Sequence, residues 1–246
     1  MRLEGKTAIV TGAGSGFGAG IARKFATEGA RVMVADINME GAEAVAAEVG
    51  GIAQKVDVAN GESVAAMIKA AQEAFGQIDI LVNNAGITHM PGPMEQVSEE
   101  DFDRVLAVNA KSVYLTAREL VPLMKAAKAG VILNVASTAG VSPRPNLNWY
   151  NASKGWMITA TRTMAVELAP FGIRVNAINP VAGDTPLLKT FMGEDTPEIR
   201  AKFLSTIPIG RFSTPEDMGN AAAFLCSDEA SMITGIAMKV DGGRCI

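Results

Sequence analysis

The sequence predicts an α/β fold, a single domain built on a doubly wound parallel β-sheet of about seven strands with helices on both faces. Three observations indicate this fold. Short apolar segments rich in β-branched residues alternate with longer segments of helical periodicity. Most of the strand-like segments are apolar throughout, as in strands covered on both faces. No repeat, linker or low-complexity segment divides the 246 residues, and α/β domains of this length are often single.

The predicted elements follow one another in a regular order. The first strand, TAIVTG at 7–12, is closed by a glycine, and the helix after it ends at Gly29. Further strands are predicted at 31–36, 52–58, 131–137 and 174–180, a strand and its turn at 79–86, and a last strand in IAMKVDGG at 236–243. Helices are predicted at 16–29, 40–49, 61–75, 99–126, 149–169 and 215–226.

One segment, at about 181–213, breaks this order and is rich in Pro, Thr, Gly, Met, Phe and Leu. It is longer than an ordinary loop, and short helices are predicted within it at 186–193 and 197–206. It begins at the carboxyl end of the sixth strand, and ligands bind at that edge of parallel sheets. We therefore expect a substrate lid rather than a simple surface excursion.

The composition excludes several functions. The chain has 22 basic and 26 acidic residues, a net charge of −4 and no cluster of Lys or Arg, which argues against a nucleic-acid partner and against an anionic membrane surface. Its two cysteines lack CxxC spacing and indicate neither a disulfide framework nor a metal site. No segment reaches about 18 apolar residues, and the apolar run at the N-terminus is too short for a signal peptide. We therefore expect a cytoplasmic protein without a membrane span.

A glycine-rich turn, TGAGSGFG at 11–18, lies between the first strand and the first helix. Gly12, Gly16 and Gly18 permit a tight turn and a close approach of the backbone to a ligand, and the helix N-terminus offers free N–H groups to a pyrophosphate. Asp36 ends the second strand, where an acid accepts hydrogen bonds from the adenosine ribose and repels a 2′-phosphate. No Arg or Lys stands at 15, 17, 37 or 38, which favours NAD over NADP. Alternatively, Asp36 only caps the next helix.

Four further features complete a resemblance. NNAG at 83–86, Asn109, Ser137 and YNASK at 150–154, together with the glycine turn, resemble the short-chain dehydrogenase/reductase family over nearly the whole chain. Ser137 and Tyr150 are 13 residues apart, a separation usual in that family. The resemblance implies a Rossmann fold, a small-molecule substrate, a homotetramer, and a catalytic tetrad of Asn109, Ser137, Tyr150 and Lys154.

The implied tetrad is chemically consistent. Tyr150 and Lys154 share one face of a helix, although such a pair is by itself usually a surface coincidence. A phenol has a pKa of about 10, and a neighbouring ammonium favours the phenolate that a general base requires. The resemblance further implies that Lys154 holds the nicotinamide ribose, that Ser137 orients the substrate oxygen and that Asn109 supports a water that relays protons. Taken singly, Ser137 could be a cap and Asn109 a buried structural amide.

The same resemblance implies the remaining cofactor contacts. NNAG should border the cofactor and stabilise the central sheet, Thr185 should contact the carboxamide, and Asp57 and Val58 should flank the adenine, although a strand-end Asp is also a common turn residue. The full set expected at the cofactor is Gly12, Ser15, Gly16, Phe17, Gly18, Asp36, Asp57, Val58, Asn84, Ala85, Gly86, Tyr150, Lys154, Pro180, Gly183 and Thr185.

The substrate pocket is expected to be built by the loops at 87–94 and 138–148 and by the lid. The candidate lining residues are His89, Thr138, Arg144, Trp149, Val181, Leu187 and Phe191. Two of them have an alternative interpretation. His89 could be an exposed loop histidine, and Arg144 could be a surface arginine instead of a group that binds an anionic substrate. The role of Trp149 stays open, and the stripe it shares with Trp156 is expected in the core or against a partner subunit.

Three positions depart from the family pattern. In NPVAGDTPLL at 179–188, Val181 stands where glycine is usual and Gly183 where a β-branched residue is common. Phe17 replaces the aliphatic residue usual before Gly18. These departures leave the path of the loop after the sixth strand undetermined.

The expected function is NAD(H)-dependent transfer of a hydride between nicotinamide and a secondary alcohol or ketone, such as a sugar, a polyol or a small hydroxy or carbonyl compound. An alternative within the family is a 3-oxoacyl-thioester (acyl-carrier-protein) reductase, although such reductases usually take NADP. A different class is a regulatory protein that binds NAD without catalysis, which an intact tetrad disfavours.

Overall fold

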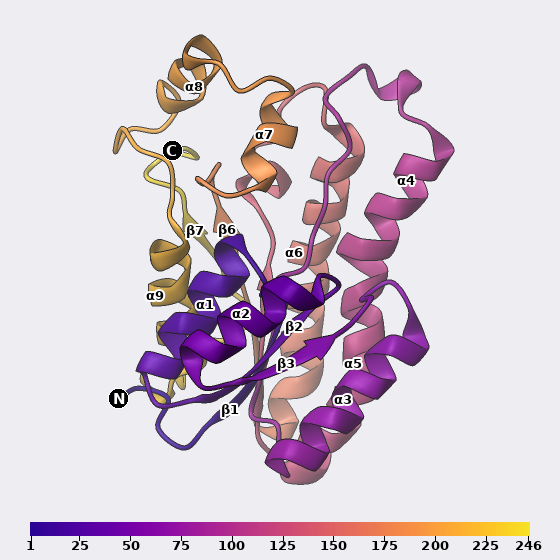
Figure 1. The fold of residues 1–246 in the computed structure, drawn as a ribbon, viewed down its shortest axis with the longest axis vertical. Coiled ribbons are helices and arrows are strands. Elements are labelled where there is room, and N and C mark those ends of the chain that lie inside the picture. The colour runs from indigo at the N-terminus through magenta and orange to yellow at the C-terminus, as the bar shows by residue number, and fades with distance from the viewer.

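A seven-stranded parallel sheet forms the centre of the computed structural model, which describes residues 1–246 (Figure 1). The strands are β1 (Thr7–Thr11), β2 (Arg31–Asp36), β3 (Ile52–Lys55), β4 (Ile80–Asn83), β5 (Gly130–Val135), β6 (Ile173–Pro180) and β7 (Ala237–Val240). Their order is β3-β2-β1-β4-β5-β6-β7, so the direction of winding reverses between β1 and β4. The doubly wound sheet of seven strands is thus confirmed.

Helices cover both faces of the sheet. They are α1 (Gly16–Thr27), α2 (Met39–Val49), α3 (Gly61–Phe75), α4 (Glu99–Leu106), α5 (Ser112–Ala127), α6 (Asn148–Leu168), α7 (Leu187–Met192), α8 (Pro197–Leu204) and α9 (Pro215–Cys226). Short 3-10 turns occupy Met94–Gln96, Thr138–Gly140, Ala169–Phe171 and Asp228–Ala230. None of the helices combines the length and the apolar character needed to cross a membrane.

Alternate strand residues fill two separate cores. In β1, Ala8 and Val10 pack with α1, α2 and α9 on one face, whereas Ile9 packs with α3, α5 and α6 on the other (Figure 1). This alternation explains why the strands are apolar throughout, since both faces of each strand are buried.

The structure differs from the predicted elements at two places. The expected strand at 52–58 ends at Lys55, because β3 is an edge strand whose pairing with β2 stops there and Asp57 starts a turn by accepting the Ala59 N–H at 2.9 Å. The expected single helix at 99–126 is divided by a π-helical turn, Ala107–Lys111, and Asn109 lies in this turn.

A chain of buried polar side chains ties the middle of the sheet to α5 and α6. The Asn83 amide donates to Asn134 Oδ1 at 2.9 Å, and Asn134 Nδ2 donates to Thr161 Oγ1 at 2.9 Å. Thr116 Oγ1 donates to Asn83 Oδ1 at 2.9 Å. Asn83, the first residue of NNAG, therefore stabilises the central sheet as expected.

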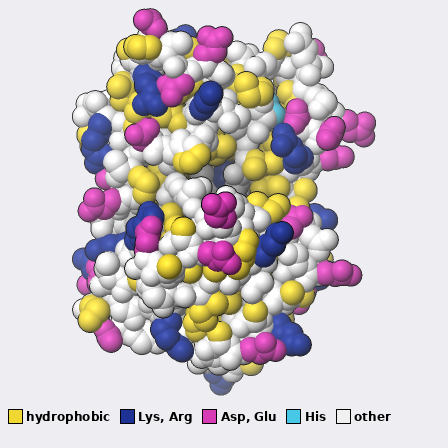
Figure 2. All heavy atoms as spheres, viewed as in Figure 1, with side chains coloured by type: hydrophobic (Ala, Val, Ile, Leu, Met, Phe, Trp, Pro, Cys, Tyr) yellow, Lys and Arg dark blue, Asp and Glu magenta, His cyan; other side chains and the backbone are white.

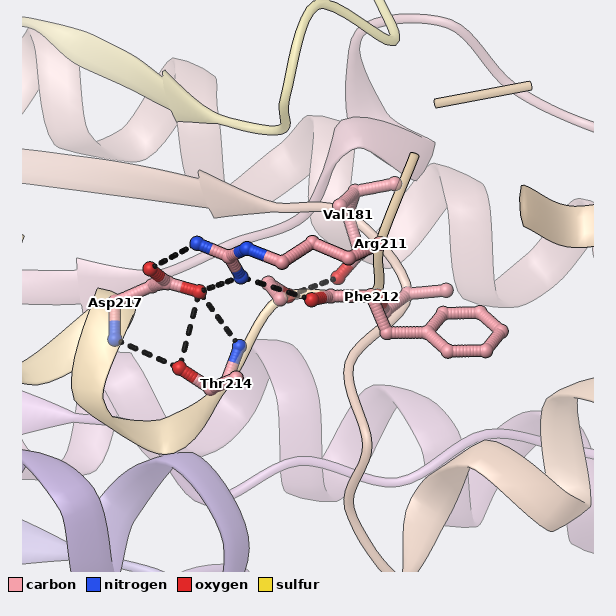
Figure 3. A network of polar contacts seen from close by, with 7 residues as sticks. Val181, Arg211, Phe212, Thr214 and Asp217 are labelled. Atoms are coloured by element: carbon pink, nitrogen blue, oxygen red, sulfur yellow. Dashed lines mark hydrogen bonds and ion pairs between the residues drawn. The ribbon is translucent and has the colours of Figure 1, made fainter. Parts of the chain in front are cut away.

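The lid is a distinct excursion that carries α7 and α8 above the sheet (Figure 1). Its two ends are held together by an isolated parallel bridge between Gly183 and Ser213. Figure 3 shows how the returning end is fixed: Asp217 accepts from the Thr214 N–H at 2.8 Å and pairs with Arg211, which completes a capping box at the start of α9. Ser213 Oγ also donates to the Val181 carbonyl at 3.1 Å. Both ends of the lid are thus fixed by hydrogen bonds, at the bridge between Gly183 and Ser213 and at the start of α9.

Candidate active site

A cavity of about 540 Å³ opens at the carboxyl edge of the sheet, beneath the lid. It is lined by the ends of β1, β4, β5 and β6, and so includes the place where the strand order reverses, which is the usual ligand site in sheets of this kind. Figure 2 shows the hollow near the middle of the face in view. All the predicted cofactor residues except Gly18 line this one cavity.

The glycine turn forms one wall of the cavity. Gly12 and Gly16 have φ of 61° and 55°, a left-handed conformation that glycine adopts without strain. Gly18 is buried, and a Cβ there would lie 2.2 Å from the Gly12 carbonyl and 2.4 Å from Asn84 Nδ2. Gly18 therefore acts by allowing α1 to pack closely on the strand ends and does not face the cavity, which corrects the expected contact.

The start of α1 suits an anionic group. Ser15 is the N-cap residue but makes no side-chain cap hydrogen bond, and the first turn carries no acidic residue. The first N–H groups of a helix have no partner within the helix, and its positive dipole end attracts anions. A Cβ at Gly12 or Gly18 would clash with the neighbouring backbone, so these glycines let the turn run close to the strand ends. With free N–H groups at the helix start and no acidic residue there, the residues present fit the pyrophosphate of a dinucleotide.

Asp36 closes the end of this cradle at which the family resemblance places the adenosine, called here the adenosine side. Its two carboxylate oxygens accept one backbone N–H each, from Gly14 at 2.8 Å and from Asn38 at 2.9 Å, and the half-buried side chain lines the cavity. The cap of α2 is Asn38, whose side chain accepts the Gly41 N–H. The alternative that Asp36 merely caps this helix is therefore wrong.

The rest of the cavity lining on the adenosine side consists of apolar and acidic side chains. Asp57 and Val58 line it together with Ile37 and Val56, and no Lys or Arg lies among these residues. Ile37 and Val56 were not predicted. An apolar residue directly after the strand-end Asp36 is the sequence signal that could have indicated Ile37.

Ser137, Tyr150 and Lys154 meet at the opposite end of the cavity. Tyr150 and Lys154 lie on α6 and are 5% and 4% exposed, and Lys154 Nζ donates to the Val135 carbonyl at 2.9 Å. The ammonium lies 5.9 Å from the centre of the Tyr150 ring. Ser137, from the end of β5, accepts the Ala139 N–H at 3.0 Å. The structure thus brings three of the four tetrad residues to one surface.

The fourth residue, Asn109, lies behind that surface. It is fully buried and does not line the cavity. Its side-chain amide makes two hydrogen bonds to the backbone of Ile87: Oδ1 accepts the Ile87 N–H at 2.9 Å, and Nδ2 donates to the Ile87 carbonyl at 2.9 Å. Nδ2 also donates to Ser153 Oγ at 3.0 Å. Asn109 therefore fixes the backbone after NNAG against α6.

Burial dominates the proton affinities of the Tyr–Lys pair. Desolvation raises the pKa of Tyr150 to about 12, although a hydrogen bond with Ser137 acts in the opposite direction. Desolvation also lowers the pKa of Lys154 to about 8. The expected lowering of the Tyr150 pKa by Lys154 is not seen in the protein alone, where burial is the largest influence on this pKa and Ser137 is the group that opposes it.

The substrate end is largely as predicted. Thr138, Arg144, Val181, Leu187 and Phe191 line the cavity, and Phe191 packs edge-to-face on Tyr150 with ring centroids 5.0 Å apart. Several lining residues were not predicted, among them Ser142, Leu147, Asn151 and Phe203. Asn151 stands inside the YNASK motif, which could have indicated it, whereas Phe203 has no such local signal.

Two predicted pocket residues, His89 and Trp149, do not line the cavity. His89 is 2% exposed, so it is neither an exposed loop residue nor a substrate contact, and its Nδ1 lies 2.8 Å from the Met90 carbonyl. Trp149 packs edge-to-face on Phe102 at 5.3 Å and donates to the Met94 carbonyl at 3.1 Å. Trp149 thus joins α6 to α4, and Trp156 is 44% exposed rather than in the core.

The departures at Phe17 and Gly183 prove to be a single feature. A Cβ at Gly183 would lie 2.2 Å from Cζ and 2.5 Å from Cε1 of the Phe17 ring. The ring therefore occupies the space in which a β-branched side chain at 183 would lie. A larger residue in the glycine turn is accommodated by a smaller one in the loop after β6.

Comparison with known proteins agrees with this geometry. A family profile described as enoyl-(acyl carrier protein) reductase matches residues 12–244. The chain is 49% identical to 4-formylbenzenesulfonate dehydrogenase of Comamonas testosteroni, over 100% of both chains. It is 40% identical to D-threitol dehydrogenase of Mycolicibacterium smegmatis, over 100% of this chain and 95% of that one.

A solved structure is equally similar. The 3-ketoacyl-(acyl-carrier-protein) reductase from Brucella melitensis complexed with NADH superposes with a TM-score of 0.95 at 53% identity, covering 99% of this chain and 100% of that one. The chain belongs to the short-chain dehydrogenase/reductase family. It is accordingly a Rossmann-fold oxidoreductase.

Proposed function

We propose that this oxidoreductase interconverts a secondary alcohol and a ketone with NAD⁺ and NADH: R₂CHOH + NAD⁺ gives R₂C=O + NADH + H⁺. The observation that carries the proposal is that one cavity holds both a dinucleotide cradle and the Ser137, Tyr150 and Lys154 side chains. The relatives support a small carbonyl or hydroxy compound as substrate, since one is named for a formylbenzenesulfonate and another for the polyol threitol.

The chain's own residues manage the proton. When bound, the nicotinamide supplies or accepts the hydride. Tyr150 exchanges a proton with the substrate oxygen, and Ser137 donates a hydrogen bond to that oxygen. Lys154 supplies positive charge beside Tyr150 and, with its pKa lowered to about 8, can also pass a proton near neutral pH. Asn109 acts as a positioning residue through its two hydrogen bonds to the Ile87 backbone.

We propose NAD(H) rather than NADP(H) as the cofactor. Two carboxylates, Asp36 and Asp57, line the adenosine side of the cavity, and no Lys or Arg lines it there. A 2′-phosphate there would meet negative charge and no cationic lining residue, whereas a ribose hydroxyl can donate to Asp36. The experiment compares kcat/KM with NADH and with NADPH. A preference for NADPH contradicts the role given to Asp36.

The test of the catalytic role is Tyr150→Phe. Turnover should be lost while NADH binding, measured by the change in nicotinamide fluorescence, stays measurable, because only the exchangeable proton is removed. Turnover equal to that of the wild type contradicts the mechanism. If the wild type binds NADH but reduces no ketone, aldehyde or thioester, the regulatory alternative is favoured instead.

A second candidate is reduction of a 3-oxoacyl thioester. The similar Brucella structure carries that name, and the substrate end of the cavity here is rich in apolar side chains such as Leu187, Phe191 and Phe203. Acetoacetyl thioesters and small ketones, assayed side by side with NADH, separate the two candidates.

We further propose that the protein works as a homotetramer in the cytoplasm, as the family resemblance implies. Large apolar side chains exposed on α5 and α6, among them Tyr114 and Trp156, support association. Sedimentation velocity showing a monomer contradicts the tetramer.

A further inference from the structure

Arg144 lines the substrate end of the cavity, Arg244 lies close to it, and neither has an acidic partner. Arg144 comes from the loop between β5 and α6, and Arg244 from the segment after β7. Arg144 lines the cavity, its guanidinium stacks 4.8 Å from the Phe203 ring centroid, and Nη2 donates to Thr206 Oγ1 at 2.7 Å. A guanidinium has five N–H donors, so most of those on Arg144 have no protein acceptor.

Arg244 stands beside it, next to another lining residue. Arg244 Nη1 lies 3.5 Å from Ser142 Oγ, and Arg244 Nε is buried without any hydrogen-bond partner. The acid of the same segment, Asp241, instead accepts the Gly243 and Cys245 N–H groups, each at 3.0 Å. A buried donor without an acceptor is costly unless a ligand supplies one.

The other partly buried arginine and those of the lid region are satisfied from within the chain. In the lid region, Arg200 pairs with Asp195 and Arg211 pairs with Asp217. Arg174, the other partly buried arginine without a carboxylate, donates to the carbonyls of residues 225, 227 and 233. Arg144 and Arg244 have neither an ion pair with a carboxylate nor a set of hydrogen bonds to backbone carbonyls. Burial lowers the pKa of Arg144 and the nearby Arg244 lowers it further, which shows two like charges held close together.

The cavity also has an apolar wall at the substrate end, beside polar lining residues such as Thr138 and Asn151. Tyr150 contacts Phe191 of α7, whereas Arg144 contacts Phe203 of α8, so the two polar groups lie under different lid helices. Leu147 and Leu187 line the same cavity. A bound molecule thus meets a proton-transfer group, an apolar wall and a cationic pair.

We propose that the substrate is a small organic anion, in which a carboxylate or sulfonate binds Arg144 with support from Arg244 and Ser142 while the carbonyl carbon lies at Tyr150. An apolar body, such as an aromatic ring, separates the two groups. This inference rests on the proposed oxidoreductase function. A guanidinium fork matches both oxyanions, and no covalent step involves either arginine.

The experiment uses substrates that differ only in charge. Reduction of 4-acetylbenzoate and of its methyl ester is measured with NADH, and the corresponding 4-formyl pair and 4-formylbenzenesulfonate are included as aldehyde and sulfonate arms. The wild type should prefer the anions. Arg144→Gln should lower the anion-to-ester ratio of kcat/KM by about 10- to 100-fold, chiefly through KM, and Arg144→Lys should lower it less. Arg244→Gln should lower the ratio by a smaller factor.

Arg162→Gln is the matched control, because Arg162 is an exposed α6 residue and its substitution should leave the ratio unchanged. NADH titration of each variant checks that the cofactor site is intact. A wild type without preference for the anion, or an Arg144→Gln ratio equal to that of the wild type, overturns the inference while the proposed function stands. If no substrate turns over, calorimetry of benzoate binding to the wild type and to Arg144→Gln still decides: equal binding overturns the inference, and the missing turnover counts against the proposed function alone.

Discussion

The contact between Phe17 and Gly183 permits a test of how the cofactor loop is packed. Gly183→Val restores a β-branched side chain at the position where the family commonly has one. Gly183 does not need a left-handed backbone, so a valine meets no strain from φ. It does meet the Phe17 ring, at 2.2 Å from the new Cβ, far inside van der Waals contact.

The magnitude follows from overpacking. Forcing extra carbons into a filled site costs about 1–3 kcal/mol, and we expect Gly183→Val to lower the free energy of unfolding by an amount in this range. Phe17→Ile alone removes part of a half-buried ring and should cost about 1 kcal/mol. In the double variant the isoleucine vacates the space that the valine needs, so the two costs should not add. The Ser213 carbonyl, 3.1 Å from the new Cβ, remains and makes the rescue partial.

The assay is a double-mutant cycle by urea unfolding, with NADH affinity measured in parallel because both residues line the cofactor cavity. We expect a coupling of about 1–2 kcal/mol in favour of the double variant. Gly92→Val is the control, since a Cβ at Gly92 meets nothing within 4 Å, and Phe17→Ile should not rescue it. Costs that add to within about 0.5 kcal/mol in the Phe17–Gly183 cycle would refute the steric explanation.

Three further perturbations test the buried site and its supports. Between pH 8 and 10 the unfolded chain holds a proton on Lys154 that the folded chain, with its Lys154 pKa of about 8, releases, so Lys154 contributes an unfolding free energy that rises with pH, whereas buried Cys226, with its pKa raised to about 12, contributes in the opposite direction. In urea unfolding at a series of pH values, the unfolding free energy of the wild type minus that of Lys154→Met should therefore rise with pH. Asn134→Leu leaves Asn83 Nδ2 without an acceptor and removes the donor to Thr161 Oγ1, which keeps its bond to the Met157 carbonyl; it should cost about 2–3 kcal/mol of unfolding free energy, so a loss below 1 kcal/mol in urea contradicts the polar chain. Asp217→Ala removes the capping box of α9 and the Arg211 pair and should cost about 1 kcal/mol, measured as a lower Tm.

The central sheet could be predicted from sequence because its signals are local. Each strand needs apolar side chains on both faces, and each turn needs glycine or a polar residue, so strand positions show directly in the residues. Their ends are less determined. The strand at 52–58 stops at Lys55 because its only neighbour, β2, stops pairing there, and pairing is a property of two segments. The π-helical turn at Asn109 has no sequence signal, since it differs from α-helix only in which carbonyl each N–H reaches.

The functional site shows the same difference between features that local sequence determines and features that depend on packing. Residues whose roles come from motifs, such as Ser137, Tyr150 and Lys154, lie together in the cavity as expected. Their proton affinities could not be predicted, because the Tyr150 pKa depends on burial created by the lid and the neighbouring loops. His89 shows the same limit, since a polar loop residue is exposed by default and only the packed structure reveals that it is 2% exposed.

Catalysis and substrate recognition depend on different parts of this chain. The cofactor cradle and the proton-transfer groups stand on strand ends and on the first turns of α1 and α6, which the two cores hold rigidly. The cationic pair comes from a loop and from the segment after β7, and it meets the lid through Phe203 and Thr206. Because Arg144 binds both the lid and, in our proposal, the substrate anion, the anion would also hold the lid over Tyr150. Loss of Arg144 should therefore weaken the binding of anionic substrates by more than the loss of the charge alone would, while the proton transfer at Tyr150 is unchanged.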